Sequence, residues 1–308
     1  MWKKELSARY YKGIIKTLEI YVLVSIADLL FKYAVLGETV TVWSAVRQIL
    51  AFKAANYSWY IEMYIGLFLL IPFLNLTYHG LKNQKQKQIL IGTMIFLTMV
   101  PKMVNNFNLS DLSWWLSPGS STDYDKLVPS FFTGMYPITY YFLGAYLREY
   151  GWEKKERSSS VWKKLLLFLL VTAVFGCYNY YRCDGAKFVW GSNNTWGGEN
   201  LITAYLLFSL LLDINTARFP KWLCRVLTYI SEISLGIYLM SWMFDKIIYS
   251  GYFLPNVADV HARWKFYPLV AGAVFLGAVF GASVIYQIQR GLHAMETCLW
   301  RRIRRNRG

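Results

Sequence analysis

The chain has 308 residues, of which 56% are hydrophobic and 18% aromatic, and its formal net charge is +15. A soluble domain of this length would show separated amphipathic elements. Here the apolar runs instead approach the roughly 20 residues needed to cross about 30 Å of hydrocarbon. The composition therefore excludes an ordinary soluble enzyme and predicts an all-α, polytopic transmembrane helix bundle, organised as a single domain over residues 1–308.

Eight apolar segments are expected to span the membrane. The first carries Glu19, Asp28 and Lys32 and lacks a small-residue cleavage site, so it is not expected to be a signal peptide. The third is short and is expected to break at Pro101. In chain order, the predicted spans are 14–36, 59–78, 88–104, 130–148, 163–181, 200–217, 226–249 and 267–289.

The basic residues set the predicted orientation. The segments between spans that would lie inside hold 23 Lys or Arg, and those that would lie outside hold 9. This bias predicts a cytoplasmic N-terminus and a cytoplasmic C-terminus. The tail "RRIRRNRG" is expected to meet membrane lipid headgroups. No folded basic domain remains outside the spans, so no nucleic-acid partner is expected.

Ionisable side chains within spans need individual explanations, because each costs about 2.5–3.5 kcal/mol near a helix centre. Asp28 and Lys32 are four residues apart, and we expect them to form a structural pair on one helix face. Glu62 lies near the outer end of the second span. Its position fits a headgroup anchor and a functional carboxylate equally well.

The segment 230–249, "ISEISLGIYLMSWMFDKIIY", carries a polar stripe. On one continuous helix, Ser231, Ser234, Tyr238, Ser241 and Asp245 fall within an arc of about 80°. Packing between helices accounts for the first two serines. Tyr238, Ser241 and Asp245 together predict a groove lined by water or substrate.

Tryptophans gather at the predicted span ends, which is typical of an aromatic belt at the membrane interface. Three of them, Trp114, Trp115 and Trp196, fall in predicted outside loops. Their flat faces are also compatible with stacking on a sugar ring, so both interpretations stay open.

Three segments resemble, in order, three spans of the integral membrane acyltransferase 3 family. They are "NYSWYIEMYIGLFLLIPFLN" (56–75), "YPITYYFLGAYLREYG" (136–151) and "ISEISLGIYLMSW" (230–242). The resemblance implies a ten-span fold in a bacterial cytoplasmic membrane. It also implies transfer of an acyl group, acetyl or succinyl, from cytoplasmic acyl-CoA to a hydroxyl of a surface polysaccharide or other glycan. Acetyl-CoA is the first donor to expect, and a histidine in the first span is the expected base.

The sequence departs from this pattern at its start. "SARYYKGIIK" (7–16) aligns Arg9 and Lys12 with the basic pair that the family associates with donor binding. Eight spans then remain where ten are expected, and we expect the native protein to be longer, with Met1 an internal start. The histidines at 79, 261 and 293 are all expected in loops or the tail, and Ser241 stands where the family often has a histidine.

Esterification needs a group that accepts the hydroxyl proton. With no histidine expected in a span, the candidates for catalysis are Glu62, Tyr238, Ser241 and Asp245, and Arg9 and Lys12 are the candidates for the donor. No Cys/His cluster indicates a metal, and none is expected. The alternative function is a non-catalytic homologue that exports an acylated glycan or scaffolds a partner enzyme. The sequence also leaves room for a homo-oligomer.

Overall fold

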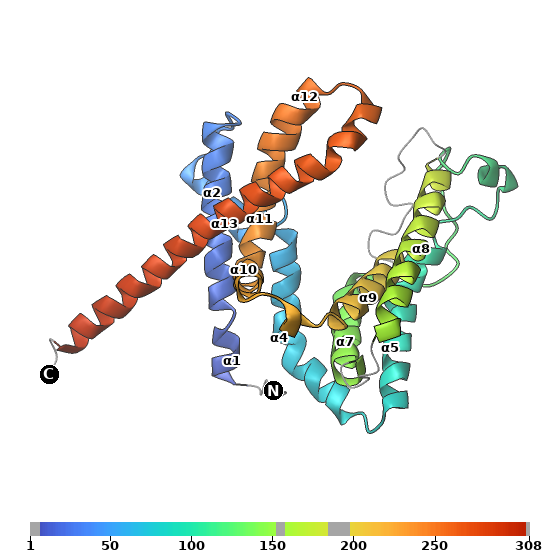
Figure 1. Ribbon diagram of the computed structural model, residues 1–308, viewed down its shortest axis with the longest axis horizontal. Helices are drawn as coiled ribbons and strands as arrows, with labels where there is room; N and C mark the ends of the chain where they lie inside the picture. Colours follow the sequence, from blue (N-terminus) through green and yellow to red (C-terminus); the bar gives the residue numbers. More distant parts are fainter. Residues whose placement is uncertain (1–6, 152–157, 184–197, 306–308) are drawn as a thin grey trace. The chain divides into compact units, whose positions relative to one another are not determined.

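A computed structural model describes residues 7–151, 158–183 and 198–305, and every regular element in these ranges is a helix (Figure 1). The all-α prediction is therefore confirmed. The chain forms two compact units: unit 1 comprises Met1–Leu70 and Arg218–Gly308, and unit 2 comprises Ile71–Ala217. The organisation of 1–308 as a single domain stays a prediction.

Unit 1 is built from helices at both ends of the chain. They are α1 (Ala8–Lys12), α2 (Ile15–Ala34), α3 (Val42–Leu50), the first half of α4 (Trp59–Gly80), α10 (Lys221–Glu232), α11 (Ser234–Phe244), the π-helix η5 (Asp245–Phe253), α12 (Leu254–Asn256) and α13 (Val260–Arg305).

Unit 2 holds the middle of the chain. It contains the second half of α4, α5 (Gln84–Thr98), α6 (Val100–Val104), the 3₁₀-helices η1 (Leu112–Leu116) and η2 (Thr133–Met135), α7 (Tyr136–Tyr146), the π-helix η3 (Leu147–Gly151), α8 (Ser158–Arg182) and α9 (Gly198–Leu212). A short 3₁₀-helix, η4 (Thr216–Arg218), leads back to unit 1.

The predicted spans all coincide with helical segments, but the helices differ in length and continuity. By length and composition, three are apolar enough to cross a membrane: Trp59–Gly80, Val161–Arg182 and Ala262–Met295. The bent pair Lys221–Glu232 and Ser234–Asn256 makes a fourth when it is taken as one span. The break expected at Pro101 occurs at Met99, between α5 and α6. The number of eight spans and their orientation stay predictions.

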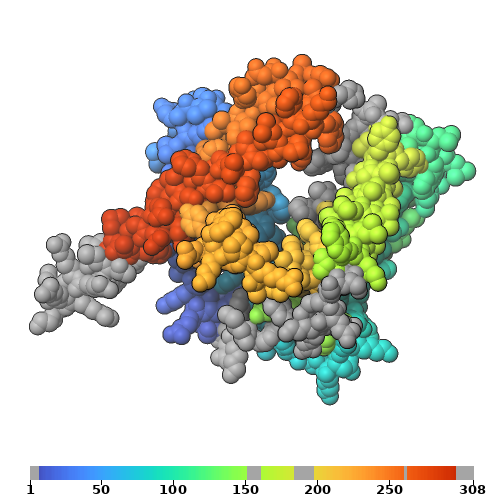
Figure 2. All heavy atoms as spheres, viewed as in Figure 1, coloured from blue at the N-terminus to red at the C-terminus, as the bar shows by residue number. Residues whose placement is uncertain are grey.

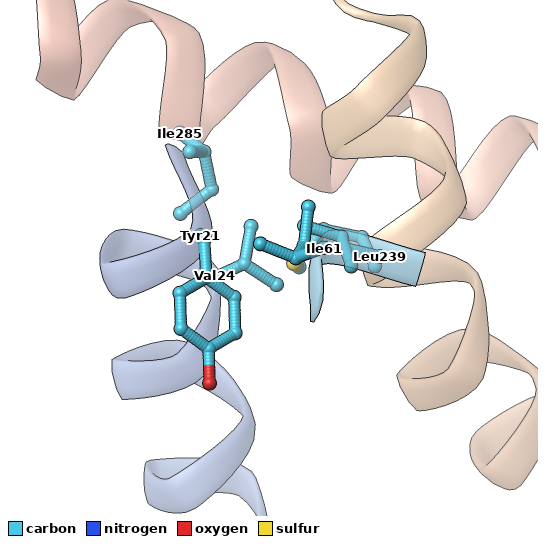
Figure 3. Packing of buried hydrophobic residues seen from close by; sticks show 6 residues of the cluster. Tyr21, Val24, Ile61, Leu239 and Ile285 are labelled. Carbon is cyan, nitrogen blue, oxygen red and sulfur yellow. The ribbon is translucent and has the colours of Figure 1, made fainter. Parts of the chain in front are cut away.

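The core of unit 1 forms where α2, α4, α11 and α13 meet. Tyr21 and Val24 of α2 pack with Ile61, Leu239 and Ile285 from the other three helices, and Figure 3 shows Val24 pointing toward Ile61 and Leu239. All five side chains are buried, so this cluster is removed from water on every side. Burial of each large apolar side chain contributes roughly 1.5–3 kcal/mol relative to exposure to water.

Helix α11 lies between α2 and α13, and its approach to α13 depends on glycines. A Cβ atom at Gly277 would collide with the ring of Phe244, and one at Gly281 would lie 2.7 Å from Met240 Cε. On the α11 side, a Cβ at Gly236 would lie 3.1 Å from Ala282 Cβ. Figure 2 shows α13, in orange and red, lying across the other helices of unit 1.

The prediction of one continuous helix through 226–249 is wrong. α10 and α11 meet at Ile233 with a bend of 72°, because Ile233 leaves helical geometry and is buried against α13. Ser231 therefore belongs to α10 and does not continue the polar stripe. From Asp245 onward the helix widens into the π-helix η5, so the stripe on a regular α-helix comprises only Ser234, Tyr238 and Ser241.

Asp28 and Lys32 interact electrostatically, but within the described residues they form no direct ion pair. Lys32 Nζ bonds Gln48 Oε1 at 3.4 Å and lies 5.4 Å from the Trp242 ring centroid. Asp28 is fully buried, and within the described part of the chain neither of its carboxylate oxygens has a hydrogen-bond partner. The cause is the fold of the segment after α2. α3 packs back along α2, with Tyr21 donating to the Ile49 carbonyl at 2.6 Å, and it offers Lys32 another partner.

Unit 2 packs α5 against α7. Tyr78, Ile91 and Phe142 form its buried apolar cluster, and the buried hydroxyls of Thr98, on α5, and Thr139, on α7, are 2.7 Å apart. At the opposite end of α5, Lys87 Nζ donates to both oxygens of Glu149, at 2.6 and 2.8 Å. Burial opposes the charge on this carboxyl, but the hydrogen bonds and the charge of Lys87 outweigh it and lower the pKa of Glu149.

The three tryptophans that were predicted to lie in outside loops have different environments. Trp114 is buried, donates from Nε1 to the Ser121 carbonyl and packs 4.7 Å from the guanidinium carbon of buried Arg182. It therefore builds the core of its loop, and its faces are not open to a sugar. Trp115 stacks on Phe107, with ring centroids 5.4 Å apart. Trp196 lies outside the described residues.

Gly277 and Gly272 lie on the same helix and allow a matched test of the α11–α13 contact. Gly277→Ala should lower the free energy of unfolding by about 1–3 kcal/mol, because the added methyl group overpacks against Phe244. A methyl group added at Gly272 would meet no neighbouring atom within 4 Å. Gly272→Ala should leave stability unchanged or raise it by about 0.5–1 kcal/mol. Thermal unfolding of both variants in one detergent makes the comparison, and equal midpoints would contradict the close approach.

The Lys87–Glu149 pair predicts a pH dependence of stability. Because the folded state lowers the pKa of Glu149, its contribution is present above the ordinary glutamate pKa of about 4.3 and is lost as the pH falls through the lowered value. Glu149→Gln should lower the free energy of unfolding by about 1–3 kcal/mol at neutral pH. The variant should also lose less stability than the unmodified protein when the pH is lowered. Thermal midpoints between neutral and acidic pH measure this, with exposed Glu38→Gln as the control. An acid profile identical to that of the unmodified protein would remove the pair from the pH response.

Candidate functional site

A cavity of about 820 Å³ lies between α11, η5 and the first half of α13; we call it the α11–α13 cavity. Ser241, Asp245 and Arg263 supply most of its polarity. Its wall is otherwise aromatic and aliphatic, including Tyr249, Trp264, Tyr267 and Phe275. A carboxylate, a guanidinium and hydroxyls on an apolar wall suit a ligand that carries both hydroxyl groups and apolar faces.

Two predicted catalytic residues, Ser241 and Asp245, face this cavity together. Tyr238 lies beside it in an aromatic cluster, with its ring centroid 5.4 Å from that of Tyr57 and 5.2 Å from that of Tyr60. Burial and the nearby Asp245 carboxylate both raise the pKa of Tyr57. The side chains of Tyr57, Tyr238 and Asp245 therefore form one neighbourhood at this end of α11.

Two of the predicted catalytic residues, Glu62 and Ser241, show no feature of a catalytic group. Glu62 is exposed on the first turn of α4 and lines neither of the cavities described here. The Ser241 hydroxyl donates to the Tyr238 carbonyl at 2.7 Å, which leaves its lone pairs for a ligand. This bond to the carbonyl three residues earlier gives no sign of activation as a nucleophile.

Arg263 lines the cavity but was not among the site residues predicted from the sequence. It entered the sequence analysis only as one of the basic residues in the predicted outside segments. Its Nε donates to the Val257 carbonyl at 2.8 Å, which ties the start of α13 to the loop before it. Its position near the start of the last apolar segment was the one feature of the sequence that could have indicated a role in this cavity.

A second cavity, of about 390 Å³, lies where the first turns of α2 meet the C-terminal half of α13; we call it the Glu19 cavity. Its polar residues are joined by hydrogen bonds. Gln289 Nε2 donates to Glu19 Oε2 at 2.9 Å and to the Lys16 carbonyl at 3.3 Å, and His293 Nε2 is 3.0 Å from Glu19 Oε2. Ile15, Leu18, Val22, Leu23 and Leu292 complete the wall.

The Glu19 cavity corrects the expectation that all three histidines lie in loops or the tail. His293 lies within α13, and His79 lies near the end of α4. His261 also falls within α13, although its side chain lies outside the described residues. The expectation failed because α13 extends past both predicted ends of the last span and α4 extends past the predicted end of the second.

The predicted donor-binding residues lie at the same end of unit 1. Arg9 and Lys12 are exposed on α1, and Tyr10 between them fixes this short helix to α4. Its hydroxyl donates to the Phe68 carbonyl at 2.7 Å, and its ring stacks on that of Phe68 at 4.5 Å. Lys12 precedes Ile15, the first residue of the Glu19 cavity, by less than one turn.

The described ranges contain no obvious set of metal ligands. Within them, no group of three or more His, Cys, Asp and Glu side chains could hold a metal ion.

A family model described as an acyltransferase domain matches residues 3–287. The chain belongs to the acyltransferase 3 family. The match runs through both units and includes α1, the α2 side of the Glu19 cavity and the whole α11–α13 cavity, whereas Gln289, Leu292 and His293 lie beyond its end. No curated protein and no solved structure matches the chain. Membership in this acyltransferase 3 family, together with the long apolar helices, supports a membrane acyltransferase in general.

Proposed function

We propose that this acyltransferase 3 protein transfers an acyl group, acetyl or succinyl, from cytoplasmic acyl-CoA to a hydroxyl of a cell-surface glycan. The donor binds at the α1 end of unit 1, where Arg9 and Lys12 attract its phosphates. Guanidinium and ammonium groups bind phosphate through charge-assisted hydrogen bonds. The glycan acceptor binds in the α11–α13 cavity.

The observation that carries this proposal is the pair of cavities on one helix. The α11–α13 cavity reaches Ala278 on α13, and the Glu19 cavity begins at Gln289. Eleven residues of helix separate these positions, which is about 16 Å at 1.5 Å per residue. Two separate sites, one beside the predicted donor cations, suit an enzyme that joins two substrates arriving at different ends.

The residues of the α11–α13 cavity fit ester formation. The acceptor oxygen forms a bond to the thioester carbonyl carbon, the carbon–sulfur bond breaks, and the hydroxyl proton passes to a base and then to the leaving thiolate. Asp245 is the base that we assign, because its carboxylate lines the cavity. Ser241 lines the same cavity as Asp245 and supports acceptor binding. Tyr238 belongs to the neighbouring aromatic cluster with Tyr57. Arg263 also lines the cavity, and we assign it the stabilisation of negative charge on the carbonyl oxygen.

Acyl transfer by the purified protein in lipid nanodiscs tests the proposal. Radiolabelled acetyl-CoA or succinyl-CoA is supplied with a glycan fraction from the host envelope, and label in the glycan is counted. Transfer that depends on the protein supports the function. CoA binding without any transfer would instead indicate the non-catalytic exporter or scaffold.

Asp245→Asn should reduce the rate of transfer by about 10²–10⁴-fold, the usual contribution of a general base. The measured quantity is the initial rate at saturating acetyl-CoA, and Asp123→Asn, an exposed carboxylate in unit 2, is the matched control. A rate equal to that of the control would remove Asp245 from the base role.

Arg9→Glu should weaken CoA binding about 10-fold or more, because it removes a charge-assisted hydrogen bond and adds a repelling charge. Equilibrium binding of radiolabelled CoA measures this. Lys85→Glu, the same charge reversal at an exposed lysine of unit 2, is the control. Unchanged affinity in Arg9→Glu would place the donor phosphates elsewhere.

A further inference from the structure

The hydrogen bonds in the Glu19 cavity leave acceptor atoms for a ligand. Glu19 uses Oε2 for both of its partners, Gln289 and His293, and Gln289 uses Nε2 for both of its own. Among the residues that the structure describes, neither Glu19 Oε1 nor Gln289 Oε1 has a hydrogen-bond partner. Gln289 is only 3% exposed, so the α2–α13 contact holds its amide in place.

The rest of the wall is apolar. Leu18 and Val22 of α2 face the cavity, and Leu292 faces it from α13. A ligand that fits must therefore carry hydrogen-bond donors on a largely aliphatic body.

Positive charge surrounds the mouth of this cavity. Lys12 and Lys16 are exposed on the segment that leads into it, and Arg290 is exposed beside Gln289 on α13. Lys16 also accepts the hydrogen bond from Gln289 through its backbone carbonyl. A ligand with a phosphate group at one end is thus favoured on this side of the cavity.

We propose that the Glu19 cavity receives the pantetheine arm of the acyl-CoA donor. The arm is an aliphatic chain with two amide N–H donors, and it joins the thioester to the phosphates of CoA. Its amides donate to Glu19 Oε1 and Gln289 Oε1, its dimethyl group packs against the leucines, and the phosphates remain at Arg9 and Lys12. This assignment rests on the proposed function and names the part of the donor site that binds the arm.

Fragments of CoA separate this cavity from the cations at α1. Leu18→Trp should fill the cavity and weaken binding of CoA and of pantetheine alone by about 10-fold, while adenosine bisphosphate binds as before. Arg9→Glu should weaken CoA and adenosine bisphosphate and leave pantetheine unaffected. Leu30→Trp, at a 61% exposed leucine of the same helix that lines neither cavity described here, should change none of the three.

Glu19→Gln tests the same assignment without a change in size. The new amide must turn its oxygen toward the donors of Gln289 and His293, so its NH₂ group faces the arm and repels the amide N–H. Binding of CoA and pantetheine should fall about 10-fold, with adenosine bisphosphate again unchanged. Glu232→Gln is the control, because Glu232 also accepts a hydrogen bond from α13, at 3.2 Å from Tyr286.

The outcomes distinguish this inference from the proposed function. An unmodified protein that binds no CoA overturns both. CoA binding that is intact in Leu18→Trp and Glu19→Gln overturns the cavity assignment alone. The cavity assignment is also overturned if Leu18→Trp loses a co-purified phospholipid and keeps its CoA affinity, because the cavity would then hold a lipid. Loss of pantetheine binding in both variants, with adenosine bisphosphate retained, supports the assignment.

Discussion

The close contact between α11 and α13 determines the rest of unit 1. Gly277 and Gly281 leave room for the Phe244 ring and for Met240, so the two helices approach until side chain meets backbone. On its other side α11 covers α2 and builds the buried cluster with Tyr21. The two cavities lie to either side of this contact along α13. One forms where η5 widens away from α13, and the other forms where α13 crosses the start of α2. Close packing in the middle of α13 therefore leaves a cavity on each side of the contact along this helix.

The bend at Ile233 shows how polar residues can mislead an interpretation based on helical periodicity. A stripe of serines on a membrane helix suggests a partner on that face. Here Ser234 donates to the Ser231 carbonyl at 3.0 Å, across the break, and Ser241 donates to the Tyr238 carbonyl. Both hydroxyls satisfy the backbone of their own segment, as short polar side chains do when they compete with the helix ladder. Asp245, in contrast, lines the α11–α13 cavity.

The sequence was sufficient for features that depend on local composition. Apolar runs located the helices, and the proline at 101 located a break to within two residues. It was insufficient where distant segments meet. The spacing of Asp28 and Lys32 predicted a pair, but α3 folds back and gives Lys32 other partners. The contact of Glu19 with Gln289 joins residues 270 positions apart, so no local rule could indicate it.

The core between the two cavities bears on which acyl group the proposed reaction would transfer. Ile285 lies on α13 between Ala278 and Gln289, and it packs with Tyr21, Val24 and Leu239 in a cluster that excludes water. In the proposed reaction the acyl group stays on the CoA thiol until the acceptor attacks it, so the thioester end of the arm must pass this apolar cluster to reach the α11–α13 cavity. A neutral acetyl group loses little there, whereas the carboxylate of a succinyl group would lose its hydration at a cost of several kcal/mol. The apolar character of this core therefore favours acetyl over succinyl as the group transferred in the proposed reaction.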